Sequence, residues 1–567
     1  MIVGIDLGTT NSVVGVYRDN DVEIFADERG HVLLPSVVAL TPSEEIVVGT
    51  QARNRRLIDP TRTVVSVKRK MGRATEVALG PRRLSPSQVS SLILKVLVDR
   101  AERALGERPT QAIITVPAYF DDAQRQATRD AGEFAGLEVL RLINEPTAAA
   151  TNYQSGDEET VMVFDLGGGT FDVSVLEREA DLLEVLSSHG DTQLGGDDID
   201  AALYRWVLER LGRDGEAIDA LPTGRARLEQ AVQRAKHGLS EQEEVRMVDP
   251  LIVQEGKLLI DLDLVITREE LERLATPIVR RTLAKVDVAL RDAQLRGPDL
   301  DRVLLVGGAS KMPLVERMVS EHLDMPALRD LDADLAVAQG AAILGARAAG
   351  VAVENILVDI TPHTLVAGAR DPERGPGFLT AAPIIPRGSV VPTAKTEPFE
   401  TVRANQSAIV LPVGQGESSD FEDVTFIGDV MLEDLPPSPV GSRVDVTYRL
   451  DLSGVLHVEA VHVPSGQRAQ TRFSKSPYRL TAREKTRAQV ELEELLEAPA
   501  ERAAPDRSVA EAILKRADRV LERAPGPHAD VEAKRDVLKA RIRAASTTED
   551  ELQQAVDELS DALLDLL

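Results

Sequence analysis

The chain has 567 residues, no cysteine and a formal net charge of −27. Its length predicts several domains, and the lack of cysteine excludes disulfides and cysteine-ligated metal sites. The acidic balance disfavours nucleic-acid binding, because a negative protein repels phosphate backbones. We expect no membrane span, since no apolar run of about 18 residues occurs. We also expect no signal peptide, since the chain enters a strand at Ile2, and a cytoplasmic location.

The first chemical signal is a Gly-containing turn between two β-type runs. It reads Asp6-Leu-Gly8-Thr9-Thr10-Asn11, and an alternating apolar run follows it. Such a pattern predicts a β-hairpin. An ordinary tight turn with an acidic flank would give the same pattern, so this copy alone does not establish a ligand site.

Residues 64–136 mix helix and strand signals. Lys68 lies in an isolated basic cluster, which by itself is typical of a solvated surface. A helix with an apolar stripe is predicted over residues 84–98, a buried strand over 111–117 and a second helix over 121–136. Residues 144–147, Asn-Glu-Pro-Thr, interrupt the pattern before the next strand begins.

The same turn pattern returns within residues 161–175, where Asp165-Leu-Gly-Gly-Gly-Thr170 joins two apolar runs. Three successive glycines allow the backbone to approach a ligand, and their N–H groups can form a concave nest for phosphate. Asp165 and Asp172 would lie beside that nest, where a hydrated Mg²⁺ could be held. Two copies indicate a duplicated domain that binds a nucleotide between its halves.

Three further segments of the second half have the character of turns or helix starts. They are the Gly-Asp turn at residues 192–197, the strand that runs into Gly307-Gly308, and the small-residue helix at residues 334–342. The helix after residue 311 would present its N-terminus to an anion. Each segment taken singly is as compatible with a loop as with a site.

Five motifs in this order resemble the nucleotide-binding domain of the DnaK-type heat-shock chaperones, the seventy-kilodalton class. They are residues 6–12, 116–120, 143–149, 164–172 and 305–308. The resemblance continues through residues 359–362 and weakens only in the C-terminal tail. The short length and residues 306–313 and 440–444 look most like the bacterial HscC-type branch.

The resemblance implies a multidomain fold that combines α/β, all-β and all-α parts. An actin-like duplicated ATPase domain would span residues 1–352, and an interdomain linker would span residues 353–362. A β-sandwich substrate-binding domain would follow over residues 363–476, and a short helical lid over residues 477–567. The expected cofactors are ATP or ADP with Mg²⁺ and K⁺.

The resemblance also implies roles at the phosphate end of the site. Lys68 and Glu145 would position the attacking water, with Asp172 and Thr170 nearby, and Lys68 is then better explained as catalytic than as a surface residue. Asp6 and Asp165 would hold Mg²⁺ through water. The implied phosphate-binding residues are Gly8, Thr9, Thr10, Asn11, Gly167, Gly168, Gly169 and Thr170.

The adenosine side departs from the family pattern. Gln233 stands where the family usually has Glu, and His237 and Lys311 stand where it usually has Arg. Lys and His stack less well than a planar guanidinium, so we expect nucleotide binding that is intact but weaker. The implied adenosine-binding residues are Gly195, Gly196, Gln233, Lys236, His237, Ser240, Gly307, Gly308, Ser310, Lys311 and Asp334.

The apolar run at residues 353–362 is the expected pivot between domains. By itself it could be a plain edge strand. By resemblance, Ile356, Leu357 and Val358 would dock on the ATPase domain when ATP is bound, and Asp359 would pair with polar residues there. The other residues implied to relay the nucleotide state are Pro117, Arg125 and Arg141.

Short strands separated by Gly, Pro, Asp and Ser predict a β-sandwich over residues 363–476. By resemblance it would clamp extended apolar peptides. The implied pocket residues are Ala367, Phe399, Val402, Ile409 and Leu411, each of which could equally be core. Residues 368–375 replace the family's Gly-Gly turn and arch, and Arg370 near the mouth would disfavour basic peptides.

The tail is predicted to be helical. Capping boxes occur at residues 481–484 and 548–551, and prolines divide the segment into three or four helices. An apolar stripe at helical spacing indicates a packed bundle. Its members are Leu552, Val556, Leu559, Leu563 and Leu566.

These features predict an ATP-dependent chaperone that binds extended apolar polypeptides and changes its peptide affinity with nucleotide state. Its expected partners are unfolded polypeptides, a J-domain co-chaperone and a nucleotide-exchange factor. The alternative is a nucleotide-switched regulator of one dedicated folded partner, which the short tail and Arg370 would suit. A metabolite kinase is disfavoured, because a β-sandwich and a lid have no place in one.

Overall fold

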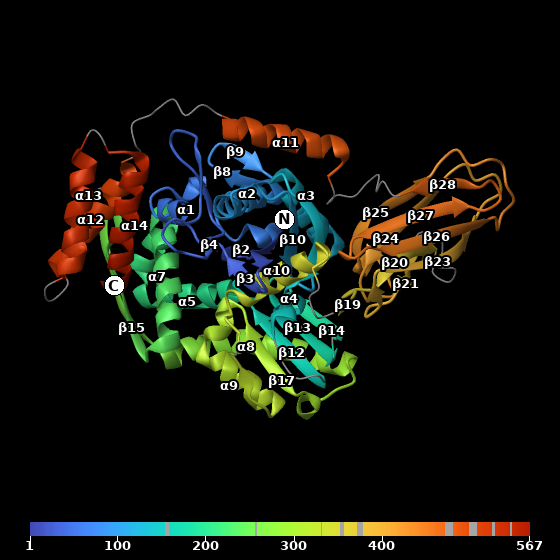
Figure 1. Cartoon of the computed structure of the whole chain (residues 1–567), viewed down its shortest axis with the longest axis horizontal. Helices are drawn as coiled ribbons and strands as arrows, with labels where there is room; N and C mark the ends of the chain where they lie inside the picture. The colour runs from blue at the N-terminus through green and yellow to red at the C-terminus, as the bar shows by residue number, and fades with distance from the viewer. Residues whose placement is uncertain are drawn as a thin grey trace.

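The computed structural model describes residues 1–566 except 154–157, 181, 256–257, 330, 352–355, 371–377, 471–479, 498–506, 524–527 and 545–546. The described residues form a two-lobed α/β body with a β-sandwich at one end and a helical bundle at the other (Figure 1). Residues up to 153 build most of lobe I and residues 158–335 build lobe II, while the helix over residues 336–348 packs back on the sheet of lobe I. Within the described part, no helix is both long and apolar enough to cross a membrane.

Lobe I is organised on a mixed sheet with strand order β11-β10-β1-β2-β3, to which β4 (Leu34–Pro35) is added at β2. The predicted first hairpin is confirmed, since β1 and β2 pair antiparallel with Leu7 opposite Ser12. The strands are β1 (Ile2–Leu7), β2 (Asn11–Arg18), β3 (Asp21–Ile24), β10 (Gln111–Val116) and β11 (Glu138–Asn144). Around them lie α1 (Thr50–Arg55), α2 (Pro86–Leu105), α3 (Asp122–Phe134) and the short strands β5 (Val38–Leu40), β6 (Ile46–Val48), β7 (Thr63–Val64), β8 (Val77–Leu79) and β9 (Arg82–Leu84).

Lobe II repeats this plan on a sheet of order β18-β17-β12-β13-β14-β19-β22. The predicted second hairpin is confirmed, with Asp165 opposite Asp172. The strands are β12 (Glu158–Leu166), β13 (Phe171–Glu179), β14 (Leu182–Asp191), β17 (Arg302–Val306), β18 (Ala327–Leu328), β19 (Ile356–Ile360) and β22 (Val390–Val391). A peripheral part adds α5 (Gly196–Leu211), α6 (Arg213–Ala220), α7 (Pro222–Glu241), α8 (Arg268–Asp292), α9 (Pro313–Leu323) and the hairpin of β15 (Glu244–Glu255) with β16 (Leu258–Thr267).

Two small-residue helices, α4 (Glu145–Asn152) and α10 (Ala336–Ala348), pack against each other where the lobes meet. A Cβ atom at Gly340 would lie 1.8 Å from the carbonyl oxygen of Ala148. Only glycine allows this approach, because any larger residue would push the two helices apart. The small-residue helix predicted at residues 334–342 is therefore present within α10, and its glycine allows close packing on α4.

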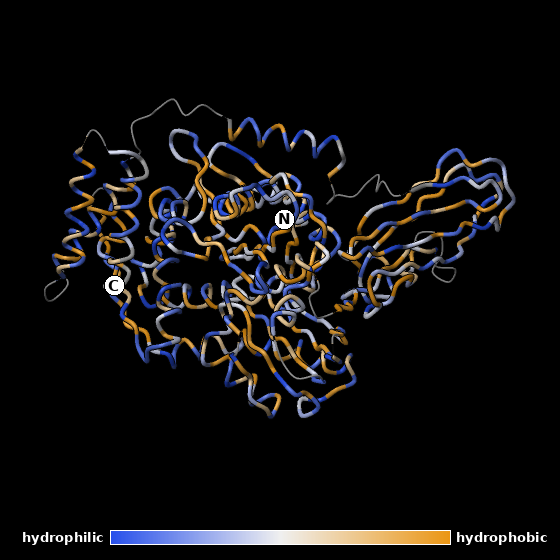
Figure 2. Tube along the Cα trace, viewed as in Figure 1, coloured by the Kyte–Doolittle hydropathy of each residue, from blue (hydrophilic) through white to orange (hydrophobic). Residues whose placement is uncertain are grey.

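The β-sandwich consists of two antiparallel four-stranded sheets, as predicted. One has the order β21-β20-β24-β25 and the other β23-β26-β27-β28. Buried residues alternate with more exposed ones along β26 and β27, and Figure 2 shows the hydrophobic residues distributed along the strands of the sandwich. The strands are β20 (Leu365–Arg370), β21 (Leu379–Ile385), β23 (Thr393–Glu400), β24 (Ile409–Gln415), β25 (Thr425–Leu432), β26 (Arg443–Leu450), β27 (Leu456–His462) and β28 (Gln467–Gln470).

In the part of the tail that the structure describes there are four helices, and none of these covers the sandwich (Figure 1). The first, α11 (Ala482–Glu497), lies on lobe I, where Ala488, Leu492 and Leu495 join the core of that lobe. The other three are α12 (Ser508–Arg523), α13 (Ala529–Arg543) and α14 (Glu549–Leu566), and we call them the C-terminal bundle. The bundle lies at the opposite end of the molecule from the sandwich (Figure 1).

Both predicted capping boxes of the tail are present. Thr481 and Glu484 bond each other's backbone N–H groups, and so do Thr548 and Glu551. The predicted apolar stripe of α14 is buried within the bundle at Leu552, Val556, Leu559 and Leu563. The side chain of Leu566 lies outside the described residues.

We expect Leu492→Ala to weaken the docking of α11 on lobe I by about 2–5 kcal/mol, because it removes a fully buried side chain from a shared core. Hydrogen exchange of the α11 amides should accelerate accordingly. Val490→Ala on the same helix is the matched control, since the Val490 side chain is 46% exposed. Equal exchange in the two variants would contradict the docking of α11 as a packed contact.

Candidate functional site

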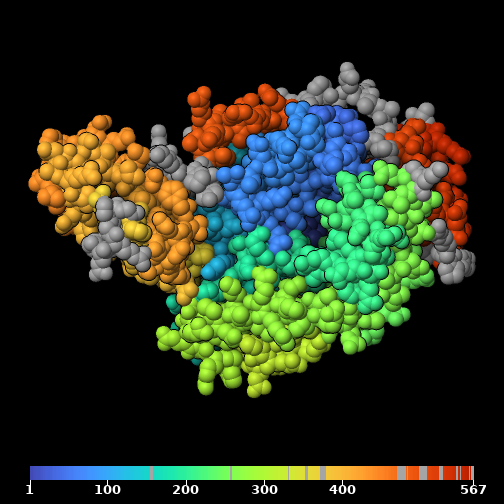
Figure 3. All heavy atoms as spheres, turned by 180° about the vertical axis from the view of Figure 1, so that it is seen from behind, coloured from blue at the N-terminus to red at the C-terminus, as the bar shows by residue number. Residues whose placement is uncertain are grey.

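A cavity of about 690 Å³ lies between the two lobes and is lined by both hairpin turns. Figure 3 shows the hollow between lobe I and lobe II. This volume is typical of a site for a ligand of nucleotide size. The phosphate-end residues that line it are Asp6, Gly8, Thr9, Thr10, Asn11, Lys68, Glu145, Asp165, Gly167, Gly168 and Thr170.

The two turns face each other at close range. A Cβ atom at Gly168 would lie 2.1 Å from the Thr10 hydroxyl oxygen, and one at Gly169 would lie 2.6 Å from Thr9. The chain of the second turn also receives hydrogen bonds from the start of α5, where the Gly196 and Asp197 N–H groups donate to the carbonyls of Gly167 and Gly168 at 2.9 and 2.7 Å. The glycines are therefore needed for contact between the lobes as well as for approach to a ligand.

A buried ion pair joins Lys68 of lobe I to Glu145 at the start of α4. Burial alone would lower the pKa of the Lys68 ammonium, but the carboxylates of Glu145 and Asp6 outweigh it and raise that pKa. Lys68 therefore keeps its charge in the cleft. The basic cluster around Lys68 would by itself be typical of a solvated surface, but the Lys68 side chain is buried.

Four carboxyl groups surround this one ammonium. Burial raises the pKa of Asp6 and of Glu145. Burial, followed by the charge of Glu145, raises the pKa of Asp165 well above its ordinary value and that of Asp172 to about 8. Burial is the main cause of these raised pKa values, and the four buried carboxyl groups share a single buried ammonium, so the cluster has more acidic groups than Lys68 can pair with.

This excess of buried negative charge fits a divalent cation, because a cation would let the carboxyl groups ionise together. Among the described residues, no three His, Cys, Asp or Glu side chains converge closely enough to ligate an ion directly. Mg²⁺ usually keeps several of its own waters and needs only one or two carboxylates. Asp6 and Asp165 are the carboxylates that line the cavity beside the two turns.

The other end of the cavity is lined by α7 and by the loop after β17. Lys236 is held by Asp200 at 2.9 Å, and Lys311 pairs with Asp334. Burial, followed by the charge of Lys236, lowers the pKa of His237, so its imidazole is neutral near pH 7. The predicted residues that line this end are Gly196, Gln233, Lys236, His237, Ser240, Gly307, Gly308, Lys311 and Asp334.

Four predicted residues do not line the cavity. Gly169 and Gly195 lie just behind the turn, and Asp172 accepts a hydrogen bond from the Tyr119 N–H at 2.9 Å. Ser310 is buried and donates to the Gly307 carbonyl at 2.6 Å. Its hydroxyl is therefore engaged in shaping the turn after β17.

The cavity also contains residues that the sequence did not assign, notably Asp197, Glu241 and Arg329. Asp197 accepts a hydrogen bond from Ser66 across the cleft at 3.0 Å. Arg69 makes a second link across the lobes, to Asp198 at 2.7 Å. The Gly-Asp turn at residues 192–197 could have identified Asp197 as a cavity residue, whereas the sequence around Arg329 contains no motif that would have identified it.

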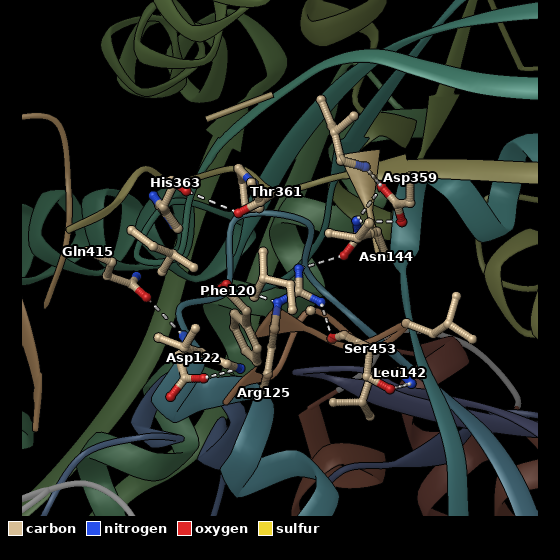
Figure 4. A pocket seen from close by; sticks show the side chains of 18 residues that line it. Phe120, Asp122, Arg125, Leu142, Asn144, Asp359, Thr361, His363, Gln415 and Ser453 are labelled. Carbon is tan, nitrogen blue, oxygen red and sulfur yellow. Dashed lines mark hydrogen bonds between the residues drawn. The ribbon is translucent and has the colours of Figure 1, made fainter. Parts of the chain in front are cut away.

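A second small cavity, between lobe I and the sandwich, contains a chain of polar contacts (Figure 4). Asn144 donates to both oxygens of Asp359 at 3.0 and 2.9 Å, and Arg125 donates to the amide oxygen of Asn144 at 2.7 Å. Arg125 also reaches the carbonyl of Ser453 in the sandwich at 3.3 Å. Sequence reasoning gave no role to Asn144, although it belongs to the motif at residues 143–149.

The apolar linker segment forms the strand β19, which adds to the lobe II sheet. Ile356, Leu357 and Val358 pair in parallel with residues 182–184 of β14. Asp359 and Ile360 then pair with β22 of the sandwich segment. A single strand thus joins the two domains, while residues 353–355 of the predicted linker lie outside the described residues.

Further contacts fix the sandwich on lobe I. Arg141 donates to the Leu452 carbonyl at 3.1 Å, and Asp122 accepts from the Leu456 N–H at 3.0 Å. His363 bonds the Tyr119 carbonyl at 3.2 Å and meets the Tyr119 ring edge-on. Pro117, also predicted as a relay residue, accepts a turn hydrogen bond from the Phe120 N–H.

The predicted peptide-pocket residues occupy different environments. Ala367 and Leu411 are buried in the core of the sandwich, because their side chains point inward from β20 and β24. Phe399 and Ile409 are partly buried against that core, and Val402 is 47% exposed. Arg370 is exposed at the end of β20, and residues 371–375 of the altered loop lie outside the described residues.

Comparison with known proteins places this arrangement in context. The family model described as Hsp70 protein matches residues 2–82 and 74–566. A protein named Chaperone protein DnaK from Thermotoga petrophila is 41% identical over 478 residues, which cover 82% of this chain and 79% of that protein. The protein of the same name from Thermotoga neapolitana shows the same identity and coverage. These matches leave the HscC-type branch as a prediction.

We expect acidification from pH 7 to pH 5 to weaken the docking of the sandwich on lobe I. Burial lowers the pKa of His363 to about 4 in the docked state, whereas an undocked imidazole would return toward 6.5. The docked state therefore binds fewer protons, so its stability is complete above pH 6.5 and falls as the pH drops toward 4. The expected loss at pH 5 is about 2 kcal/mol.

Protease cleavage within the linker should report this undocking. His363→Gln can still donate to the Tyr119 carbonyl but does not titrate, so its cleavage should be much less sensitive to pH. The same pH dependence in wild type and variant would show that another group controls docking.

Proposed function

This chain belongs to the Hsp70 family of ATP-dependent chaperones, and we propose how its own residues carry out the ATPase reaction and pass its result to the sandwich. In the proposed reaction, ATP binds between the lobes with its phosphates at the two turns. Phosphoryl transfer needs positioning and charge neutralisation more than covalent help. Mg²⁺ would neutralise phosphate charge from the side of Asp6 and Asp165, and K⁺ is proposed from the family resemblance alone.

Lys68 and Glu145 are proposed to orient the attacking water. Their ion pair is buried and lines the cavity at the phosphate end, so a water beside it could donate to the carboxylate. Thr170 lines the same end, and Asp172 lies behind it. Thr9, Thr10 and the N–H groups of the glycine turn are available to bind phosphate oxygens.

The observation that carries the proposed coupling is the position of Asn144 next to Glu145. Glu145 pairs with Lys68 in the cleft, while Asn144 bonds Asp359 of the linker strand and Arg125. Arg125 in turn reaches Ser453 of the sandwich. A change at Glu145 on hydrolysis can therefore alter the contacts that hold the sandwich.

The sandwich is proposed to bind extended apolar polypeptide segments, through backbone hydrogen bonds and an apolar pocket. Val402, Phe399 and Ile409 are the predicted pocket residues with accessible surface, whereas Ala367 and Leu411 would have to become accessible. Docking on lobe I would favour fast peptide exchange, and undocking would favour slow exchange. We propose that this chain binds nucleotide more weakly than is usual for the family, because Gln233, His237 and Lys311 replace the usual residues at the adenosine side.

A J-domain co-chaperone and a nucleotide-exchange factor are the proposed partners, and a cytoplasmic location is proposed with them. The support is the similarity to proteins named Chaperone protein DnaK. The same similarity favours a chaperone over a regulator of one folded partner. Generic apolar peptides should stimulate ATP hydrolysis in the first case only.

We expect Lys68→Ala to lower the rate of ATP hydrolysis by about 10²–10⁴-fold, because water loses a positioned charge in the transition state. Single-turnover hydrolysis with the purified full chain would measure it. Lys70→Ala is the matched control, since Lys70 is an exposed member of the same basic cluster. Similar rates for Lys68→Ala and wild type would refute the catalytic assignment.

Asn144→Ala should keep basal hydrolysis within an order of magnitude of wild type but abolish its stimulation by an unfolded apolar peptide. The reason is that the variant removes the donor to Asp359 and the acceptor for Arg125. Asn152→Ala, at the other end of α4, breaks only a contact to Gln339 and should be stimulated normally. Full stimulation of Asn144→Ala would exclude this coupling route.

A further inference from the structure

The C-terminal bundle contacts both lobes of the ATPase domain at the outer end of the nucleotide cleft. Figure 1 shows α12 and α14 beside α1 of lobe I and beside α7 and β15 of lobe II. The bundle therefore contacts both lobe I and lobe II. These two lobes must move apart before a nucleotide can leave the cleft.

The contact with lobe I is centred on Asp557 of α14. Its carboxylate, 4% exposed, pairs with Arg29 and accepts a hydrogen bond from Asn54 at 2.8 Å. Ile58, just after α1, packs against the apolar core of the bundle. The buried Asp557 carboxylate has two partners from lobe I, so this is a specific contact.

The contact with lobe II involves α12. Arg516 lies 3.7 Å from Asp249 of β15, a buried carboxylate that also pairs with Arg227 of α7. Arg519 donates to the amide oxygen of Gln254 at 2.8 Å. The bundle thus supplies an anion that pairs with a cation of lobe I, and two arginines that meet a carboxylate and an amide oxygen of lobe II.

Helix α7 connects these contacts to the nucleotide. Gln233 and His237 line the nucleotide cavity from this helix, while Gln230 and Arg234 line a small cavity shared with the bundle. That small cavity is also lined by Arg53 of α1, Arg516 of α12 and Ser560 of α14. A movement of α7 away from lobe I would therefore open the adenosine side and break the contacts of the bundle together.

Other links also join the lobes near this end, because Ser66 and Arg69 of lobe I bond Asp197 and Asp198 at the start of α5. Arg56 of lobe I pairs with Glu229 of α7, and both side chains are partly exposed. A partly exposed ion pair holds two bodies together less firmly than a buried carboxylate with several charged or polar partners. Beneath it, a cavity of about 600 Å³ extends from Arg53 and Arg56 down to His237.

We infer that the C-terminal bundle is an intramolecular clasp that holds lobes I and II together across the outer end of the nucleotide cleft and slows nucleotide release. Release of ADP then requires the bundle to detach from at least one lobe. This inference rests on the adenosine end of the cleft assigned under the proposed function. It gives the tail a role that is independent of peptide binding.

The test is the release rate of a fluorescent ADP analogue from the full chain, chased with excess unlabelled ADP in the presence of Mg²⁺. Asp557→Ala removes the charged contact of the bundle with lobe I, and Arg516→Ala removes one of its two described polar contacts with lobe II. Each should raise the release rate, and Asp557→Ala by about tenfold or more, because truncation of a buried charged contact acts mainly on dissociation. Asp536→Ala on the exposed side of α13, which pairs only with Arg535, should leave the rate unchanged.

Two variants on the ATPase side guard against a misfolded bundle. Arg29→Ala and Gln254→Ala leave α12, α13 and α14 unaltered, yet both should speed release. If Arg29→Ala, Gln254→Ala and Asp557→Ala all bind ADP and release it at the wild-type rate, the clasp is refuted while the nucleotide site stands. A wild-type chain that binds no ADP would overturn the nucleotide site, and the clasp with it.

Discussion

The structure depends on one electrostatic constraint, the burial of four carboxyl groups around the single ammonium of Lys68. Such a cluster is unfavourable by itself, since burial and then the charges of Glu145, Asp172 and Asp6 oppose the ionisation of Asp165. A bound cation and phosphate would complete it. The site is therefore arranged for a ligand that brings both charges, and the two lobes close around that ligand from opposite sides.

Glycine allows this closure to be tight. The two turns meet at a distance where a side chain on Gly168 would collide with Thr10. Glycine allows a similarly close approach where α4 packs on α10 at Gly340. Helix α4 begins with Glu145, the proposed catalytic partner of Lys68, and directly follows Asn144, which bonds Asp359 of the linker strand. The proposed catalytic contact and the contact to the linker strand are thus one residue apart.

The tail shows how one set of helices can act on the ATPase domain at two places. Helix α11 shares the core of lobe I, while the C-terminal bundle reaches both lobes beyond the cleft. With the sandwich also docked on lobe I, every accessory part of the chain contacts the ATPase domain in this arrangement (Figure 1). Nucleotide state can then be communicated to each part directly.

The sequence by itself determined the local features. Both phosphate hairpins, the capping boxes of α11 and α14, the apolar stripe of α14 and the alternating strands of the sandwich depend on neighbouring residues and short hydrogen bonds, so their patterns are visible in the chain. The family resemblance added the lining of the cleft. Most of the assigned residues do line it, including Lys68, which local pattern alone would have placed on the surface.

Only the tertiary structure decided which faces meet. It turned Ser310 back onto its own loop, placed Ala367 and Leu411 in the sandwich core, gave Asn144 its position between Asp359 and Arg125, and set the bundle against both lobes. These outcomes depend on complementarity between segments that are distant in sequence. The sequence alone does not reveal that complementarity, because a charged residue in a buried ion pair and a charged residue in solvent are the same amino acid.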